Sequence, residues 1–153
     1  MSLPLVIFVA NAGATFCLVG LIWTVQLVHY PTFHYVDEAR FRAFEAFHQR
    51  RISCVVLPLM MAEALTSLLL PWLSPDFVSK PLAFLGLAMV ALAWLSTFLL
   101  QVPLHTALSS GFSADAARRL VTTNWVRTIA WSARGVLVAW LLIAALSPGV
   151  RHP

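Results

Sequence analysis

Charged residues are scarce in this chain. Of its 153 residues, 10% are charged and 60% are hydrophobic. A soluble domain usually carries about 25% charged residues. A chain with so little charge has too few polar side chains to cover a folded surface in water. The composition therefore excludes an ordinary soluble domain and predicts an integral membrane protein that contacts the lipid bilayer.

Cysteine is also scarce, and no motif for nucleic-acid binding occurs. Cys17 and Cys54 have no CxxC spacing and lie in apolar runs, so we expect two small buried side chains and no disulfide. The formal net charge is +4, but the ten basic residues stand in short segments beside apolar runs. Such placement orients membrane spans, and we expect no nucleic-acid partner.

Four apolar segments predict the fold. Each is long enough to cross a bilayer as an α-helix, at about 1.5 Å per residue. The first is an uncharged run from Leu3 to Val28, which is too long for the apolar part of a signal peptide. We therefore predict an all-α fold, a single membrane four-helix bundle over residues 1–153. The spans are expected at about 4–29, 52–73, 82–104 and 126–147.

The first and third connections are themselves predicted to be helical. Residues 36–51 read as an amphipathic helix between spans one and two, because Phe41, Phe44 and His48 recur at spacings of three and four. Pro31 is expected to break the first helix before it. In the third connection a helix is predicted to start near Ser113 and to run into the fourth span.

Basic residues predict the orientation in the membrane. The side that holds connections one and three is rich in arginine, whereas the other side offers Lys80 and Arg151. The positive-inside rule places the arginine-rich side in the cytoplasm. We therefore expect a multi-pass protein of the inner (plasma) membrane with both termini outside the cytoplasm. The arginines are Arg40, Arg42, Arg50, Arg51, Arg118, Arg119 and Arg127.

Every span carries polar or aromatic residues at helical spacing. In hydrocarbon such groups turn inward and find one another, so they are expected to face the bundle axis and to line a pocket. Eight polar residues are expected at the cytoplasmic ends of the spans, namely Gln26, His29, His48, Arg51, Gln101, His105, Asn124 and Arg127. The set is Asn11, Thr15, Trp23, Gln26, either His29 or Tyr30, His48, Glu63, Thr66, Trp94, Thr97, Gln101, His105, Asn124, Arg127, Trp131 and Arg134.

Glu63 and Arg134 are expected to pair near the middle of the membrane. Glu63 lies roughly 16 Å deeper than Ile52, and Arg134 about 10 Å deeper than Arg127, at 1.5 Å per residue. A lone buried carboxylate would be too costly to keep charged. One hypothesis is that this pair forms the floor of the pocket. The alternative is an ion pair that only fixes the helix register.

Histidines and tryptophans are the remaining candidates. His29, His34, His48 and His105 share one interfacial zone, where imidazoles could bind haem or a metal ion, or act as acid and base without a cofactor. Simple hydrogen bonding is the alternative. Trp23, Trp94 and Trp131 could stack on a flat ligand, and ordinary bundle packing is the alternative.

The second half of the chain resembles a known family. Val102-Pro103-Leu104-His105 with Leu108, followed by Asn124-Trp125-Val126-Arg127-Thr128, is similar to a family of small four-helix membrane proteins that includes the anthrone oxygenases. Those enzymes oxidise polycyclic anthrones to quinones without a known cofactor. The resemblance implies that Asn124 and Arg127 are shared family features, whereas His105 stands where the family pattern has asparagine.

These observations favour a membrane redox enzyme or oxygenase that acts on a lipophilic aromatic or quinone-like molecule. His29, His48 or His105 would remove a proton, and Asn124 with Arg127 would stabilise the oxyanion. One alternative is a non-enzymatic haem- or metal-binding subunit of a membrane complex. Another is a small proton-linked transporter that works as a homo-oligomer. The expected substrate-binding residues are Trp23, Gln26, Glu63, Trp94, Gln101, Trp131 and Arg134.

Overall fold

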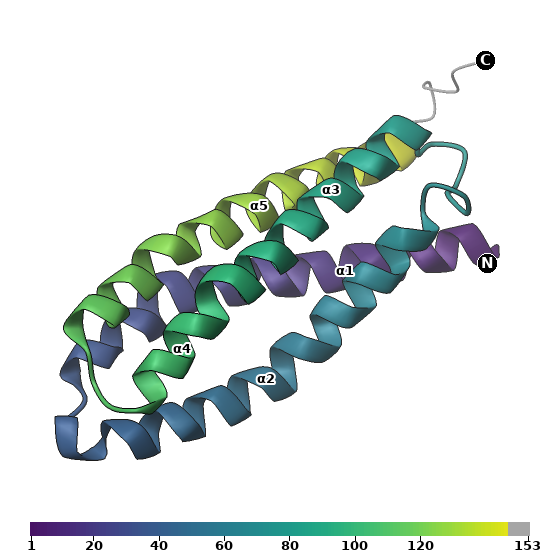
Figure 1. The fold of residues 1–153 in the computed structure, drawn as a ribbon. Helices are drawn as coiled ribbons and strands as arrows, with labels where there is room; N and C mark the ends of the chain where they lie inside the picture. Colours follow the sequence, from purple (N-terminus) through teal and green to yellow (C-terminus); the bar gives the residue numbers. More distant parts are fainter. Residues whose placement is uncertain (147–153) are drawn as a thin grey trace.

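The protein is a bundle of four long helical rods, shown in the computed structural model of Figure 1. The structure describes residues 1–146, so Arg151 and the end of the predicted fourth span lie outside the described residues. All four rods are long and apolar enough to cross a membrane, and no strand occurs within residues 1–146. The predicted all-α membrane bundle is confirmed. The rods are Leu3–Tyr35, Glu38–Leu69, Lys80–Ser109 and Ala114–Leu146.

The first and third rods change helix type part of the way along. In the first, α1 (Leu3–Thr24) passes into a π-helical turn, η1, and then into a 3-10 helix, η2. In the third, α3 (Lys80–Ser96) passes into a π-helical turn, η3, and then into α4. These shorter elements are η1 (Val25–His29), η2 (Tyr30–Tyr35), η3 (Thr97–Gln101) and α4 (Val102–Ser109).

The prediction that Pro31 breaks the first helix is wrong. Pro31 lies in the first turn of η2, where its missing N–H costs no hydrogen bond within the helix, and the chain stays helical to Tyr35. Pro103 occupies the same kind of position at the start of α4. Each π turn therefore directly precedes a helix whose second residue is a proline.

The second and fourth rods are single helices. The predicted amphipathic segment forms the first turns of α2 (Glu38–Leu69), and the Asp37 side chain caps it by accepting a hydrogen bond from the Ala39 N–H. The fourth rod, α5 (Ala114–Leu146), continues from the third connection into the membrane as predicted. Ser113 accepts a hydrogen bond from the Ala116 N–H at its start.

The rods alternate in direction. Figure 1 shows the start of α1, the connection between α2 and α3, and the described end of α5 at one end of the bundle. The connections α1–α2 and α4–α5 lie at the opposite end, which we call the arginine-rich end because it carries Arg40, Arg42, Arg118 and Arg119. Large apolar side chains cover the outer surface, as a lipid-facing protein requires. Cys17 and Cys54 belong to that surface and are exposed, so the expectation that both are buried is wrong.

Candidate functional site

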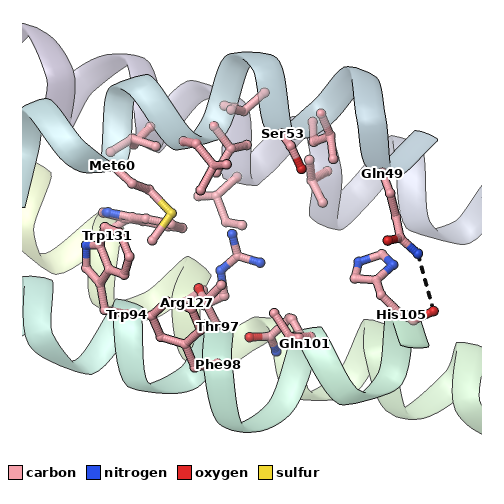
Figure 2. A pocket seen from close by; sticks show the side chains of 18 of the residues that line it. Gln49, Ser53, Met60, Trp94, Thr97, Phe98, Gln101, His105, Arg127 and Trp131 are labelled. Carbon is pink, nitrogen blue, oxygen red and sulfur yellow. Dashed lines mark hydrogen bonds between the residues drawn. The ribbon is translucent and has the colours of Figure 1, made fainter. Parts of the chain in front are cut away.

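A cavity of about 210 Å³ lies between the rods toward the arginine-rich end. Figure 2 shows it between α2 on one side and the third rod on the other. Several lining residues are also exposed on the outer surface, among them Leu57, Val102 and Phe98, which is 56% exposed. The cavity therefore reaches the lipid-facing surface between α2 and the third rod, and a molecule dissolved in the bilayer could reach it without crossing water.

The polar residues of the lining come from all four rods. They alternate with apolar and aromatic side chains, which is the usual composition of a site for a small molecule. Figure 2 places Trp131, Trp94 and Met60 at one end of the cavity and His105 with Gln49 at the other. The polar lining residues are Tyr30, Gln49, Ser53, Thr97, Gln101, His105, Thr106 and Arg127.

The guanidinium of Arg127 stands in the middle of this space (Figure 2). Arg127 is only 7% exposed, and its Nη1 donates to Asn124 Oδ1 at 3.3 Å. The guanidinium also lies over the Trp131 ring, 5.1 Å from its centroid. Its Nε is buried without a hydrogen-bond partner. Among residues 1–146, no ion pair joins Arg127 to a carboxylate. A buried cation with an unused donor is a strong site for an oxygen atom or a negative charge.

A hydrogen-bond network on the side away from the cavity holds Arg127 in place. Asn124 Nδ2 and Thr128 Oγ1 both donate to Gln26 Oε1, at 2.9 and 3.2 Å. Gln26 Nε2 donates to the Val121 carbonyl at 3.1 Å. Gln26 and Asn124, both predicted as site residues, are buried behind Arg127 and do not line the cavity. They fix Arg127 instead.

Gln101 lies in the lining as predicted, at the end of the π turn η3. Its Oε1 accepts a hydrogen bond from Ser96 Oγ at 3.1 Å, and its Nε2 donates to Thr123 Oγ1 at 3.3 Å. A π turn adds a residue to one turn of helix and rotates the residues that follow. The two π turns, η1 and η3, immediately precede Tyr30 and the His105-bearing helix, and thereby set where these side chains point.

A second polar group occupies the His105 end of the cavity. His105 Nδ1 lies 2.6 Å from Glu45 Oε1, and His105 Nε2 lies 3.1 Å from the Tyr30 hydroxyl. Gln49 Nε2 donates to Glu45 Oε1 at 2.9 Å and to the His105 carbonyl at 3.3 Å, the contact drawn in Figure 2. Glu45 is completely buried. The side chains of Glu45, His105 and Tyr30 therefore form one hydrogen-bonded row that ends at the cavity.

Glu45 and Gln49 are absent from the residues predicted from the sequence. The signal for Glu45 is the Glu-x-x-His spacing of Glu45-Ala46-Phe47-His48, which places both side chains on one helix face. Gln49, four residues after Glu45, continues that face. For Tyr30 the signal is its helical spacing from Gln26, which left either His29 or Tyr30 on the polar stripe of the first span; the structure places Tyr30, and not His29, in the lining.

The other histidines lie outside the cavity. His29 Nε2 and His48 Nδ1 share a hydrogen bond of 2.6 Å, and neither residue lines the cavity, so neither is placed to take a proton directly from a ligand there. His34 stands apart against Phe112. Within residues 1–146 no three histidine, cysteine or acidic side chains are arranged to hold a metal ion. Glu45 Oε2 and His48 Nε2 are buried without a hydrogen-bond partner.

Glu63 and Arg134 form the predicted ion pair, with Arg134 Nε 2.9 Å from Glu63 Oε1. The pair does not line the cavity, so the prediction that it forms the floor is wrong. Trp131 separates the ion pair from the cavity, because its side chain lines the cavity and its Nε1 donates to Glu63 Oε2 at 2.9 Å. Arg134 Nη2 also donates to Asn11 Oδ1 at 2.8 Å. This network ties α1, α2 and α5 together.

Trp23, also predicted as a site residue, does not line the cavity. It is 38% exposed, its Nε1 donates to Ser132, and its ring meets Trp125 edge to face. Trp94 and Trp131 do line the cavity as predicted. Helical spacing predicts that Trp23 lies next to the polar stripe. In the structure its side chain instead lies on the partly exposed outer surface of the bundle.

Comparison of the chain with protein-family models, with curated proteins and with solved structures found no match.

Proposed function

We propose that this integral membrane protein takes a hydroxylated or quinone-like aromatic molecule from the bilayer into its cavity and catalyses its oxidation. The single observation that carries the proposal is the buried Arg127 guanidinium, which faces an apolar cavity and lacks a carboxylate partner among the described residues. A ligand oxygen would accept the hydrogen bond that the buried Nε of Arg127 is free to donate.

The lining supports an aromatic ligand. Trp131 and Trp94 offer flat apolar surfaces at one end, and Arg127 lies over the Trp131 ring. A closed apolar cavity of about 150 Å³ accepts benzene, so about 210 Å³ with an open mouth suits a two- or three-ring system. The exposed lining residues Leu57 and Phe98 support access from the bilayer.

Oxidation is the proposed reaction because a guanidinium next to a phenolic oxygen favours its anion, and an aromatic oxyanion gives up electrons more readily than the neutral hydroxyl. With dioxygen as oxidant, a hydroquinone yields a quinone and hydrogen peroxide. An anthrone, the substrate class implied by the family resemblance, exchanges its CH₂ group for a carbonyl, with one dioxygen consumed and one water formed.

The proposal is tested with the full chain in lipid nanodiscs. Binding of 1,4-naphthoquinone is measured by quenching of tryptophan fluorescence, and oxidation of 1,4-dihydroxynaphthalene or anthrone by oxygen uptake. We expect Arg127→Gln to weaken naphthoquinone binding by about tenfold to a hundredfold, the loss of one charged hydrogen bond. Arg118→Gln, which changes an exposed arginine on the same helix, is the matched control. Equal affinity in wild type and Arg127→Gln would reject the proposed binding mode.

A further inference from the structure

The row of side chains formed by Glu45, His105 and Tyr30 has the arrangement of a proton relay. Each link is a hydrogen bond between side chains: 2.6 Å from His105 Nδ1 to Glu45 Oε1, and 3.1 Å from the Tyr30 hydroxyl to His105 Nε2. The three residues come from α2, α4 and η2, so the row is assembled only in the folded bundle.

The carboxylate fixes the roles of the two imidazole nitrogens. Because a carboxylate only accepts, Nδ1 of His105 must carry the hydrogen that it donates to Glu45. In the neutral imidazole Nε2 is then the acceptor, and the Tyr30 hydroxyl donates to it. Gln49 donates a further hydrogen bond to the same Glu45 oxygen, which favours the carboxylate form.

Tyr30 is the member of the row that meets a ligand. Its side chain is buried and lines the same cavity as Arg127. His105 also lines the cavity, but its Nε2 is engaged by Tyr30 and its Nδ1 by Glu45. A ligand oxygen that contacts Arg127 would therefore meet the Tyr30 hydroxyl before it could reach a free imidazole nitrogen.

We propose that Tyr30 is the acid–base residue of this site and that Glu45 and His105 accept the proton behind it. The O–H bond of a phenolic ligand breaks, and its proton passes to the Tyr30 oxygen. At the same time the proton of Tyr30 passes to His105 Nε2. The electron pair stays on the ligand oxygen next to Arg127, and the imidazolium of His105 is paired with the Glu45 carboxylate.

This assignment rests on the proposed function and narrows its substrate class. Tyr30 and Arg127 line the same cavity, and in the proposed step both act on one ligand oxygen. The ligand must then carry an acidic hydroxyl on an aromatic ring, as in a hydroquinone or the enol form of an anthrone. Both products of the step are ion pairs, so no single charge is left in the apolar cavity. Glu45 acts through His105 and is a positioning residue.

The test compares Tyr30→Phe with Tyr35→Phe in nanodiscs. Tyr35 lies on the same 3-10 helix and is fully exposed, so it controls for the loss of a hydroxyl. For 1,4-dihydroxynaphthalene we expect Tyr30→Phe to lower kcat by about 100-fold or more, the usual contribution of a positioned acid–base group. Tyr35→Phe should keep the wild-type kcat, because Tyr35 does not line the cavity.

Glu45→Gln supplies a second measurement that a purely structural role would not reproduce. We expect it to lower kcat at unchanged KM, with no further loss when it is combined with Tyr30→Phe, because the two residues act in one relay. Multiplied losses in the double variant would overturn the relay. Absent binding and absent oxygen uptake by wild type would overturn the proposed function and the relay with it. Equal kcat for wild type and Tyr30→Phe would overturn the relay alone.

Discussion

The ion pair between Glu63 and Arg134 makes a quantitative prediction for the stability of the bundle. Arg134→Met removes the guanidinium and leaves the Glu63 carboxylate buried among α1, α2 and α5. Glu63 would keep its hydrogen bonds from Thr15 Oγ1 at 2.8 Å and from Trp131 Nε1 at 2.9 Å, but it would lose its counter-charge.

Two magnitudes separate the possible causes of that destabilisation. Arg134 donates three hydrogen bonds, to Glu63, Asn11 and Ser67. Hydrogen bonds between membrane helices contribute on average about 0.6 kcal/mol each, so their loss alone would cost about 2 kcal/mol. Leaving one partner of a buried ion pair uncompensated costs about 3–5 kcal/mol. We expect Arg134→Met to lower the free energy of unfolding by the larger amount.

The second variant in the cycle is Glu63→Gln. Combined with Arg134→Met it leaves a neutral amide that still accepts hydrogen bonds, so we expect the double variant to recover at least about 2 kcal/mol relative to the sum of the single variants. Unfolding is followed by circular dichroism in mixed micelles of increasing denaturing detergent. Additive losses, or a loss below about 2 kcal/mol for Arg134→Met, would refute the reasoning. Because the pair does not line the cavity, naphthoquinone affinity per folded molecule should stay within about threefold in all three variants.

Three further predictions concern packing, the cavity and orientation. Gly86→Ala would place a Cβ 2.6 Å from a guanidinium nitrogen of the ion pair, so we expect it to cost about 1–3 kcal/mol in the same unfolding assay, whereas Gly13→Ala has open space and should be neutral or slightly stabilising. Ser53→Phe adds a ring to the cavity lining and should weaken naphthoquinone binding at least about tenfold without unfolding the protein. In a variant without the native cysteines, Tyr35→Cys should be protected from a membrane-impermeant maleimide added to intact cells, and Trp72→Cys should react.

Each of these predictions has an outcome that contradicts it. Equal stabilities of Gly86→Ala and Gly13→Ala would show that the guanidinium does not need the space beside the glycine. Undiminished binding by Ser53→Phe would mean that the quinone binds elsewhere. Labelling of Tyr35→Cys in intact cells would reverse the proposed orientation, in which the arginine-rich end faces the cytoplasm.

The fold could be predicted from the sequence because hydropathy and helix length are properties of single segments. Four apolar runs longer than a bilayer is thick leave little choice beyond helices. The pairing of Glu63 with Arg134 was predictable for a similar reason, since each charge needs a partner at its own depth. Depth follows directly from the residue count along a helix.

The site was only partly predictable, because the direction in which a side chain points depends on the rotation of its helix about the helix axis. Arg127, Gln101, Trp94, Trp131 and His105 were predicted and do line the cavity. The π turns η1 and η3 shift the rotation of the residues that follow, and an ideal helical period does not include such turns.

The hydrogen-bond partners of the histidines could not be predicted from the fact that His29, His48 and His105 lie at the same end of the bundle. His29 and His48 lie at the same end of the bundle as His105, yet they bond each other outside the cavity. Only His105 reaches the lining, and it does so with both ring nitrogens already engaged by Glu45 and Tyr30.

The most direct test of the central claim is to locate a bound aromatic ligand by photo-crosslinking. 4-Hydroxybenzophenone has two rings, a phenolic hydroxyl and a photoreactive carbonyl, and its attachment sites can be mapped by mass spectrometry of the nanodisc-embedded protein. We predict attachment on the cavity-facing residues of α2, with Met60 and Ser53 among them, and its loss in Arg127→Gln but not in Arg118→Gln. Attachment spread over the lipid-facing surface, at equal yield in all three proteins, would contradict the account.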